Sequence, residues 1–309
     1  MNTLPLSKAI EGYLINAAAR RLSPNTIHFY VNTFKKVKRF FPADPDIGDI
    51  TTGQVEQFLA SLTTLSKKSL LGHHAGLSSL WRWATKEKLA ASNIIREIQQ
   101  PHPEERIVSP FTEAEVKSLL AALDKSRPYR RPGKRECQHT ITTAARNRAL
   151  LFVLLDTGMR AAELCGLHIN DVDLKARHVR VMGKGSKERL IPFSAQTGQI
   201  LWRYIALRKE ETVNAILFPS ARTGRELPPR ELWHIVSRIG RRAGVADTHP
   251  HRFRHTFAIQ YLRNKGDVYT LQAILGHTTL DMVRRYLAIA QTDIEAAHRV
   301  ASPVANWRL

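Results

Sequence analysis

Residues 178–193 read HVRVMGKGSKERLIPF, and this stretch separates the chain from an all-helical protein. Val179 and Val181 alternate with polar neighbours in its first half. A Gly-Lys-Gly turn follows at 183–185, and apolar residues return at 190–191. Alternation with a period of two on both sides of a glycine-containing turn is typical of a β-hairpin. We therefore predict a hairpin with basic residues at its tip.

Helical patterns lie on both sides of this hairpin. Apolar residues recur there every three to four positions, which is the spacing of one helix face. A capping box from Thr112 to Glu115 opens a helix that we expect to run through Leu123. Further helices are predicted over 145–167, 196–210, 229–243, 251–264, 267–275 and 279–290. This part of the chain is therefore predicted to be mainly helical with a small antiparallel sheet.

The first hundred residues predict a separate all-helical unit. One helix covers 5–20, and Ser23-Pro24 supplies an N-cap and a first-turn proline for the next. Thr51 or Thr52 begins a third helix and Ser66 a fourth. The proline-rich segment 98–110, IQQPHPEERIVSP, is typical of an extended linker. We place a helical domain at 1–100, a linker at 101–110, a second domain at 111–292 and a C-terminal tail at 293–309.

The charge balance predicts an anionic partner. Lys and Arg number 47 and Asp and Glu 27, which gives a net charge of +20. Such a field concentrates polyanions, so nucleic acid is favoured first and an anionic membrane second. No apolar run approaches the roughly 18–20 residues that span a bilayer, and the N-terminus lacks a signal-peptide core. The two cysteines, Cys137 and Cys165, argue against a disulfide scaffold or a Cys-rich zinc module and fit a reducing cytoplasm.

Basic and aromatic residues mark the ends of several predicted elements. Taken singly, each has an ordinary structural interpretation: a surface charge for an arginine or lysine, a helix cap for a histidine, a core position for a tyrosine. The chain has no Walker loop, no H-E-x-x-H zinc motif and no G-x-S-x-G elbow. The six candidate catalytic residues are Arg160, Lys184, His251, Arg254, His277 and Tyr286.

Four segments carry these six residues: LLDTGMRAAELCGL (154–167), VMGKGSKERLIPF (181–193), HPHRFRHTFA (249–258) and LQAILGHTTLDMVRRYLAI (271–289). In order and in spacing they resemble the signature segments of the tyrosine recombinase, or phage integrase, family, which includes Xer-like, transposon and phage integrases. The six positions are separated by 24, 67, three, 23 and nine residues. The resemblance covers the second domain and extends more loosely to the N-terminal helices, which are similar to the family's core-binding domain.

The resemblance implies a fold and a reaction. A helical, SAM-like core-binding domain and an α+β catalytic domain would form a C-shaped clamp on DNA. The enzyme would be a cytoplasmic site-specific recombinase that acts without ATP, cofactor or metal ion. It would cleave and rejoin double-stranded DNA at inverted-repeat core sites, through a 3′-phosphotyrosyl intermediate and a Holliday junction in a tetrameric synapse. Integration and excision of a mobile element is the expected biological role, and integron-type exchange and chromosome dimer resolution are the alternatives.

The resemblance also implies a role for each candidate. Arg160 and Arg254 would clamp the scissile phosphate, which suits planar guanidinium groups, and would stabilise the charge of the transition state. Tyr286 would attack phosphorus, and Lys184 would protonate the leaving 5′ oxygen. This agrees with phosphoryl transfer in general, which needs positioned positive charge and an in-line nucleophile.

The two histidines and three neighbours complete this interpretation. His251 would assist proton transfer at the tyrosine, and His277 would donate a hydrogen bond to the phosphate. Glu163, one helical turn after the first arginine, is expected to orient it. Lys187 is the fallback for the general acid. His255 is expected to point away from the site and to be structural.

Candidate DNA contacts lie mainly in basic segments outside the six positions. Residues 126–135, SRPYRRPGKR, hold five basic side chains and no acid, and are interpreted either as a phosphate-contacting loop or as a solvated one. The candidate contacts are Lys35, Lys36, Arg127, Arg130, Arg131, Lys134, Arg135, Lys187, Arg252 and Arg285.

Two other functions stay open at this stage. A non-catalytic DNA-binding regulator would explain the charge and the helices, but not the set of six residues. A type IB topoisomerase would share the chemistry without exchanging DNA partners, and the helical N-terminal domain and the tail favour recombination over it. The tail at 293–309 either packs on its own domain or docks on a neighbouring subunit.

Overall fold

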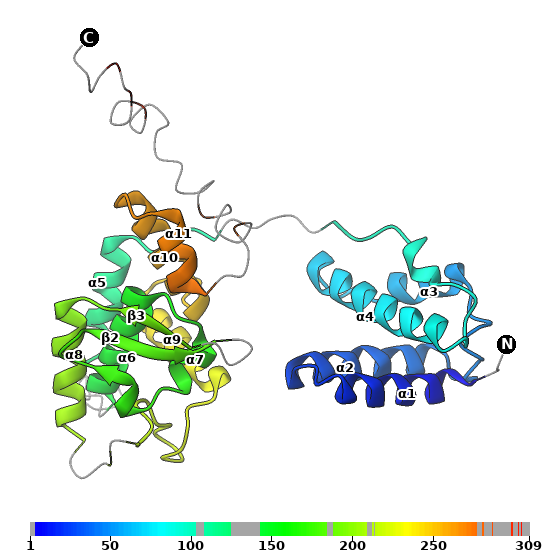
Figure 1. The fold of residues 1–309 in the computed structure, drawn as a ribbon, viewed down its shortest axis with the longest axis horizontal. Helices are drawn as coiled ribbons and strands as arrows, with labels where there is room; N and C mark the ends of the chain where they lie inside the picture. The colour runs from blue at the N-terminus through cyan, green and yellow to red at the C-terminus, as the bar shows by residue number, and fades with distance from the viewer. Residues whose placement is uncertain are drawn as a thin grey trace, which may run out of the picture. The chain divides into compact units, whose positions relative to one another are not determined.

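The computed structural model of the chain describes residues 4–102, 108–124, 143–183, 188–208, 212 and 214–276, and residues 280, 286, 298, 302 and 304. Internal contacts divide the chain into two units, Met1–Arg106 and Ile107–Leu309 (Figure 1). Each unit is described by itself. None of the helices that the structure describes is long and apolar enough to cross a membrane.

The regular elements of the first unit, among its described residues, are helices. Three of them begin at predicted caps, because the side chains of Ser23, Thr51 and Ser66 accept the backbone N–H groups of the third residue after them. The elements are α1 (Leu6–Ala19), α2 (Pro24–Phe40), α3 (Thr52–Ser61), α4 (Lys67–Lys86) and the 3₁₀ turn η1 (Ile94–Arg96). The all-helical prediction for this part of the chain is therefore confirmed.

Aromatic rings join α1, α2 and α4 in the core of the first unit. Tyr13 of α1 is buried, and its ring centroid lies 5.5 Å from that of Tyr30, 5.7 Å from that of Phe34 and 6.0 Å from that of Trp83. Such tilted and edge contacts are favoured geometries for aromatic pairs. The three helices are thus fixed against one another by one aromatic cluster.

The second unit surrounds a small antiparallel sheet with helices (Figure 1). The predicted hairpin is confirmed: β2 (His178–Met182) pairs with β3 (Glu188–Pro192), with Val181 opposite Arg189. A short strand that the sequence did not indicate, β1 (Val172–Asp173), pairs on the other side of β2. The helices are α5 (Glu113–Ala121), α6 (Ala144–Thr157), α7 (Ala161–Cys165), α8 (Ala195–Ala206), α9 (Pro229–Ala243), α10 (Pro250–Arg263) and α11 (Val268–Leu275), with η2 (Ile169–Asp171) before the sheet.

One apolar face of the sheet enters the main core of this unit. Val179, Val181 and Ile191 are buried there, together with Leu150 and Leu154 of α6. Helix α6 also packs against α8 and α10, while α9 packs against α5 and α7. A second, smaller core joins α10 and α11 and includes Tyr286. The sheet and α6 therefore form the support on which α10 and α11 are placed.

The single helix predicted over 145–167 is wrong. Gly158 ends α6 in a left-handed conformation, with φ of 59°, and α7 starts only at Ala161. A Cβ at Gly158 would lie 2.3 Å from the ring of Phe257, so a side chain has no room there. The break matters because it places Arg160 at the N-cap of α7 instead of inside a helix.

Three further expectations fall wholly or mainly on residues outside the described ones. The helix predicted at 279–290 is described only at Leu280 and Tyr286, and Tyr286 is helical. Most of the tail at 293–309 and all of the basic segment 126–135 also lie outside the described residues.

Candidate active site

Arg254 is the buried centre of the site. It lies in the first half of α10 and is only 3% exposed. Its guanidinium donates to the carbonyl oxygens of Gly158 and Leu275, both at 2.8 Å. Burial, with the neighbouring charge of Arg160, lowers the pKa of Arg254 to about 10. The group stays cationic at neutral pH, and both bonds hold it in one orientation.

Arg160 lies beside it on the more exposed side. Because Arg160 caps α7, Glu163 folds back and accepts both its backbone N–H at 2.8 Å and its guanidinium at 3.0 Å. The side chain of Arg160 is 42% exposed, whereas that of Glu163 is 7% exposed. Glu163 therefore has the geometry expected of a residue that orients Arg160.

Three guanidinium groups meet at the C-terminal end of α11. Arg189 donates to the carbonyl of Ile274 at 2.9 Å, and Arg160 donates to the carbonyl of Gly276 at 3.1 Å. Arg254 bonds the carbonyl between them. The last carbonyl groups of a helix have no partner within the helix and carry partial negative charge. They hold three cations of like sign in one small region.

Tyr286 is buried against this cationic region, at 4% exposure. Burial raises the pKa of its hydroxyl above the ordinary value, while the charge of Arg254, a hydrogen bond from Arg254 and the charge of Arg160 act in the opposite direction. Its ring contacts His255, with centroids 5.1 Å apart. The tyrosine oxygen thus lies next to the two arginines that the sequence grouped with it.

The expectation that His255 points away from the site is wrong. Its ring lies between those of His251, at 4.5 Å between centroids, and Tyr286. One helical turn separates His251 from His255 on α10, which aligns their side chains. Burial and the neighbouring cationic groups lower the pKa of His255 to about 4, and its buried Nδ1 has no hydrogen-bond partner among the residues that the structure describes. His251 itself is exposed.

The structure thus brings together four of the six candidates: Arg160, His251, Arg254 and Tyr286. Lys184 and His277 lie outside the described residues, although the strands that flank Lys184 and the glycine that precedes His277 are described. Among the candidate DNA contacts, Lys35 is exposed and Lys36 is half-buried, with its ammonium 3.4 Å from Nε2 of His73. The candidates outside the described residues are Arg127, Arg130, Arg131, Lys134, Arg135, Lys187 and Arg285.

Arg252 is wrongly predicted as a DNA contact. Its side chain is 9% exposed and faces into the unit. The guanidinium donates to the carbonyls of Ser109 and Ala246 and to the carboxylate of Glu115, and it lies 4.0 Å above the ring of Phe111. These contacts fasten the segment before α5 to α10, so Arg252 is a structural residue.

Sequence reasoning missed a basic face on α9. Arg230, His234, Arg238 and Arg241 are exposed at successive helical turns, beside the half-exposed Trp233. Residues three or four apart share one side of a helix, so these groups form one stripe. The signal was present in the sequence as cationic residues at helical spacing, without an acidic residue on that side. We call these four residues the α9 basic face.

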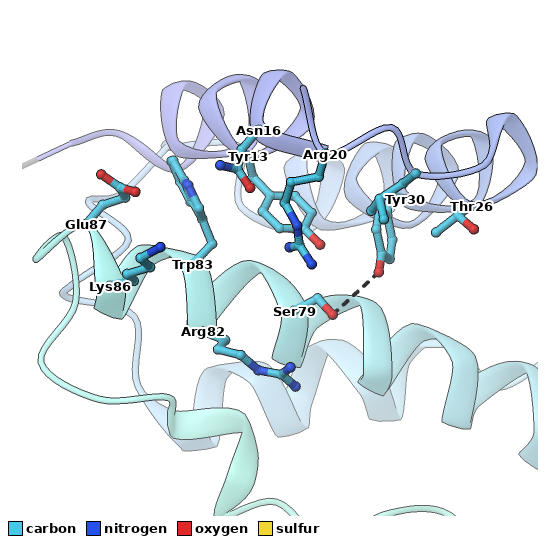
Figure 2. A pocket seen from close by; sticks show the side chains of 11 residues that line it. Tyr13, Asn16, Arg20, Thr26, Tyr30, Ser79, Arg82, Trp83, Lys86 and Glu87 are labelled. Atoms are coloured by element: carbon cyan, nitrogen blue, oxygen red, sulfur yellow. Dashed lines mark hydrogen bonds between the residues drawn. The ribbon is translucent and has the colours of Figure 1, made fainter. Parts of the chain in front are cut away.

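The first unit contains a pocket of about 290 Å³ between α1, α2 and α4 (Figure 2). Tyr13, Tyr30 and Trp83 form an aromatic wall, and Tyr30 donates a hydrogen bond to Ser79 at 3.5 Å. Exposed cations stand around it, namely Arg20, Arg82 and Lys86. Lys35 and Lys36 do not line this pocket.

A metal site is not found in the described part of the chain. Among those residues, no group of three or more His, Cys, Asp or Glu side chains is placed to hold a metal ion. The described site offers three guanidinium groups, a pair of imidazoles and a buried phenol for chemistry.

Comparison with known families accounts for this arrangement. Residues 110–292 match the phage integrase family, and residues 10–88 match the N-terminal SAM-like domain of phage integrases. The tyrosine recombinase XerD of Mycobacterium tuberculosis is 29% identical over 307 residues, which covers 94% of each chain. XerD of Pseudomonas putida is 31% identical over 234 residues, which covers 74% of each.

Solved structures agree on the fold. The Tn1549 transposon integrase in complex with a circular intermediate DNA has a TM-score of 0.77 at 18% identity, covering 98% of this chain and 100% of that one. XerH recombinase bound to palindromic difH substrate has a TM-score of 0.69 at 22% identity, covering 92% and 80%. The family match spans more than half of the chain and includes every candidate catalytic residue. The chain therefore belongs to the phage integrase family and is a tyrosine recombinase.

Proposed function

We propose that this recombinase cleaves and rejoins DNA through the hydroxyl of Tyr286, with Arg160 and Arg254 binding the scissile phosphate. The observation that carries the proposal is the position of Tyr286, which is buried close to the cationic side chains of Arg160 and the buried Arg254. A phosphate oxygen bound by these guanidinium groups would lie next to the attacking oxygen. Preorganised donors of this kind stabilise transition-state charge without having to move during the reaction.

The reaction exchanges one phosphoester for another. The Tyr286 oxygen forms a bond to phosphorus, the bond from phosphorus to the 5′ oxygen breaks, and that oxygen takes a proton. We assign the proton donor to Lys184 and a hydrogen bond to the phosphate to His277, both by family position. His251 assists removal of the phenol proton. Rejoining is the reverse attack by a 5′ hydroxyl, so the reaction needs neither ATP nor a metal ion.

Exposed cations outside the site would hold the DNA. The α9 basic face offers four groups in a row, and Lys35 lies on α2 of the first unit. Lysine and arginine gain affinity for DNA because phosphates release bound counterions when they are neutralised. We infer that the partner is double-stranded DNA carrying inverted-repeat core sites. A lambda integrase tetramer bound to a Holliday junction, a structural neighbour, supports the same assembly here.

The cellular location and the biological role are inferred from the family. We infer a cytoplasmic enzyme that integrates or excises a mobile element, with the tail at 293–309 docking on a neighbouring subunit. Deletion of residues 293–309 should then lower the cooperativity of binding to paired sites. Unchanged cooperativity would exclude tail docking while leaving the chemistry untouched.

A suicide duplex tests the chemistry. The native chain first selects its site from DNA with random inverted repeats, and that site is rebuilt with a nick beside the cleavage position, so that the released strand diffuses away. We expect a covalent complex that disappears in Tyr286→Phe and persists in Tyr269→Phe, a matched control at a 69% exposed tyrosine of α11. A bound but uncleaved duplex in the native chain would favour a DNA-binding regulator. Relaxation of supercoils without strand exchange would favour a topoisomerase.

A further inference from the structure

Arg189 lies behind the two arginines that would bind phosphate. It belongs to β3, and its side chain is 15% exposed, compared with 42% for Arg160. All three guanidinium nitrogens are used inside the protein. Nε donates to the carbonyl of Ile274 at 2.9 Å, and the two terminal nitrogens donate to both carboxylate oxygens of Glu163 at 3.0 and 2.9 Å.

Glu163 is shared between Arg189 and Arg160. The oxygen Oε1 that accepts from Arg189 also accepts from the Arg160 guanidinium at 3.0 Å, and Oε2 accepts the Arg160 backbone N–H at 2.8 Å. Burial by itself would raise the pKa of Glu163, but the bonds from Arg189 and Arg160 hold it below the ordinary value. Glu163 is therefore an anion that needs both arginines.

This sharing decides how much charge the site offers to DNA. Arg160 and Glu163 alone would form a neutral pair, which attracts a phosphate only weakly. With Arg189 the three groups carry one net positive charge, and the exposed member of the trio is Arg160. The bidentate fork of Arg189 also fixes the plane of the Glu163 carboxylate, and hence the direction of the Arg160 guanidinium.

Arg189 also fixes the end of α11. Gly276 has φ of 62°, and a Cβ built on it would lie 3.0 Å from the Arg189 guanidinium. The chain therefore passes directly over Arg189 just before residue 277. On its own strand, Arg189 lies five residues after Lys184 and opposite Val181 of β2. One side chain thus ties the hairpin to both the α7 cap and the α11 end.

We propose that Arg189 is a positioning residue of the recombinase, holding Glu163 and the carbonyl groups at the end of α11 so that Arg160 meets the scissile phosphate. Arg189 itself does not touch DNA. The inference rests on the proposed function, because it assumes that Arg160 binds that phosphate.

Cleavage and binding are measured separately on the nicked suicide duplex described above. Arg189→Ala should slow covalent-complex formation at saturating protein by about 100-fold, the usual cost of about 1 Å of misplacement at a reacting centre. The dissociation constant should change by less than about threefold, because Arg189 affects only the one phosphate that Arg160 would bind, whereas the duplex is held by many exposed cations. Arg189→Lys should recover only part of the rate, because one ammonium cannot replace a planar fork. Arg180→Ala is the matched control, an exposed arginine of β2 that pairs with Asp171 at 3.3 Å.

A double-mutant cycle shows whether Arg189 acts through Glu163. Glu163→Gln and Arg189→Ala should each slow cleavage, and the double variant should be no slower than the slower single one, because both changes break the same link. The proposal would be overturned if Arg189→Ala cleaved at the native rate, or if its DNA affinity fell as much as its cleavage rate. It would also be overturned if the double variant lost as much rate as the product of the two single losses.

Folding and the proposed chemistry are controlled separately. If Arg189→Ala does not fold, Gly276→Ala serves as a second variant, because its added Cβ displaces the Arg189 guanidinium without removing it. This variant must also slow cleavage while leaving DNA affinity nearly unchanged. A native chain that forms no covalent complex defeats the proposed function. Cleavage at equal rates by the native and the Arg189 variants defeats only this inference.

Discussion

The two units hold their positive charge in different ways. In the second unit, Arg160, Arg189 and Arg254 each donate to a carbonyl at the end of α11, and Arg254 is 3% exposed. In the first unit, Lys35 and Arg82 are exposed side chains on α2 and α4. Cations bonded to carbonyls keep their geometry when a phosphate arrives, whereas exposed cations gain mainly by releasing counterions. Under the proposed function, the cations bonded to carbonyl groups act in the chemistry, and the exposed cations of the first unit provide DNA affinity.

The largest effect should come from the most buried cation. Arg254→Lys keeps a positive charge, but a single compact ammonium cannot span the carbonyl oxygens of Gly158 and Leu275 and a phosphate as the wide, planar guanidinium does. Cleavage should therefore slow by about 1,000-fold, the upper range for removal of one transition-state donor. DNA affinity should change little. The measurement is the single-turnover rate of covalent-complex formation, with Arg263→Lys, an exposed arginine at the end of α10, as control. If Arg254→Lys cleaved at the native rate, the fixed orientation of the Arg254 guanidinium would be unnecessary for cleavage. The contrast between the two groups of cations would then be wrong.

The second prediction concerns the stability of the catalytic unit at low pH. The pKa of His255 falls from 6.5 to about 4 on folding, so the unfolded chain binds more protons than the folded one between these values. Stability therefore falls as the pH drops through this window, by at most about 3 kcal/mol for this residue. His255→Phe should flatten the pH dependence of the denaturant midpoint between pH 7 and pH 4.5.

The control for His255 comes from the first unit. His28 is exposed on α2, and His28→Asn should leave the pH profile of the native chain unchanged. Equal profiles for His255→Phe and the native chain would show that His255 is accessible to solvent protons in the folded state. In that case the His255 ring, which lies between His251 and Tyr286, would not be shielded from solvent.

Local signals in the sequence predicted most of the elements, and tertiary contacts decided the rest. The caps at Ser23, Thr51 and Thr112 depend on side chains that bond the backbone three residues later, so a short window reveals them. The break at Gly158 depends on the ring of Phe257, which lies 99 positions further along the chain. The helical spacing of apolar residues continues through Gly158, so the sequence pattern alone predicts no break there.

The site shows the same division. Arg160, Arg254 and Tyr286 were grouped by resemblance, and they lie together. Arg252 was misplaced because its partners come from residues 109–115 and from Ala246, which a sequence window cannot align with α10. Arg189 was not predicted, for the same reason. Its proposed role depends on contacts with Glu163 and Ile274, which lie 26 residues before it and 85 residues after it in the sequence.

The third prediction addresses the exposed cations of the second unit. Arg238→Ala combined with Arg241→Ala should weaken DNA binding about 10- to 100-fold at moderate salt and lower the slope of log affinity against log salt by about 2, if each arginine neutralises one phosphate. The cleavage rate of the bound complex should stay near the native value. Binding is measured as a salt titration on the selected site, with Arg203→Ala on α8 as control. An unchanged slope would remove the α9 basic face from the DNA surface.

The smallest effect should come from a single exposed lysine of the first unit. Lys35→Ala removes one charge without disturbing the core, so affinity should fall about threefold to tenfold and the salt slope by about 1. Lys8→Ala is the matched control, because Lys8 already pairs with Glu11 at 3.0 Å and has less to gain from a phosphate. Dissociation constants are measured at low and high salt, and the affinity loss of Lys35→Ala is compared with that of Lys8→Ala at each salt concentration. If Lys35→Ala slowed cleavage of bound DNA as well, the first unit would contribute to positioning. Bonding to carbonyl groups would then no longer separate the cations that act in chemistry from those that hold the duplex.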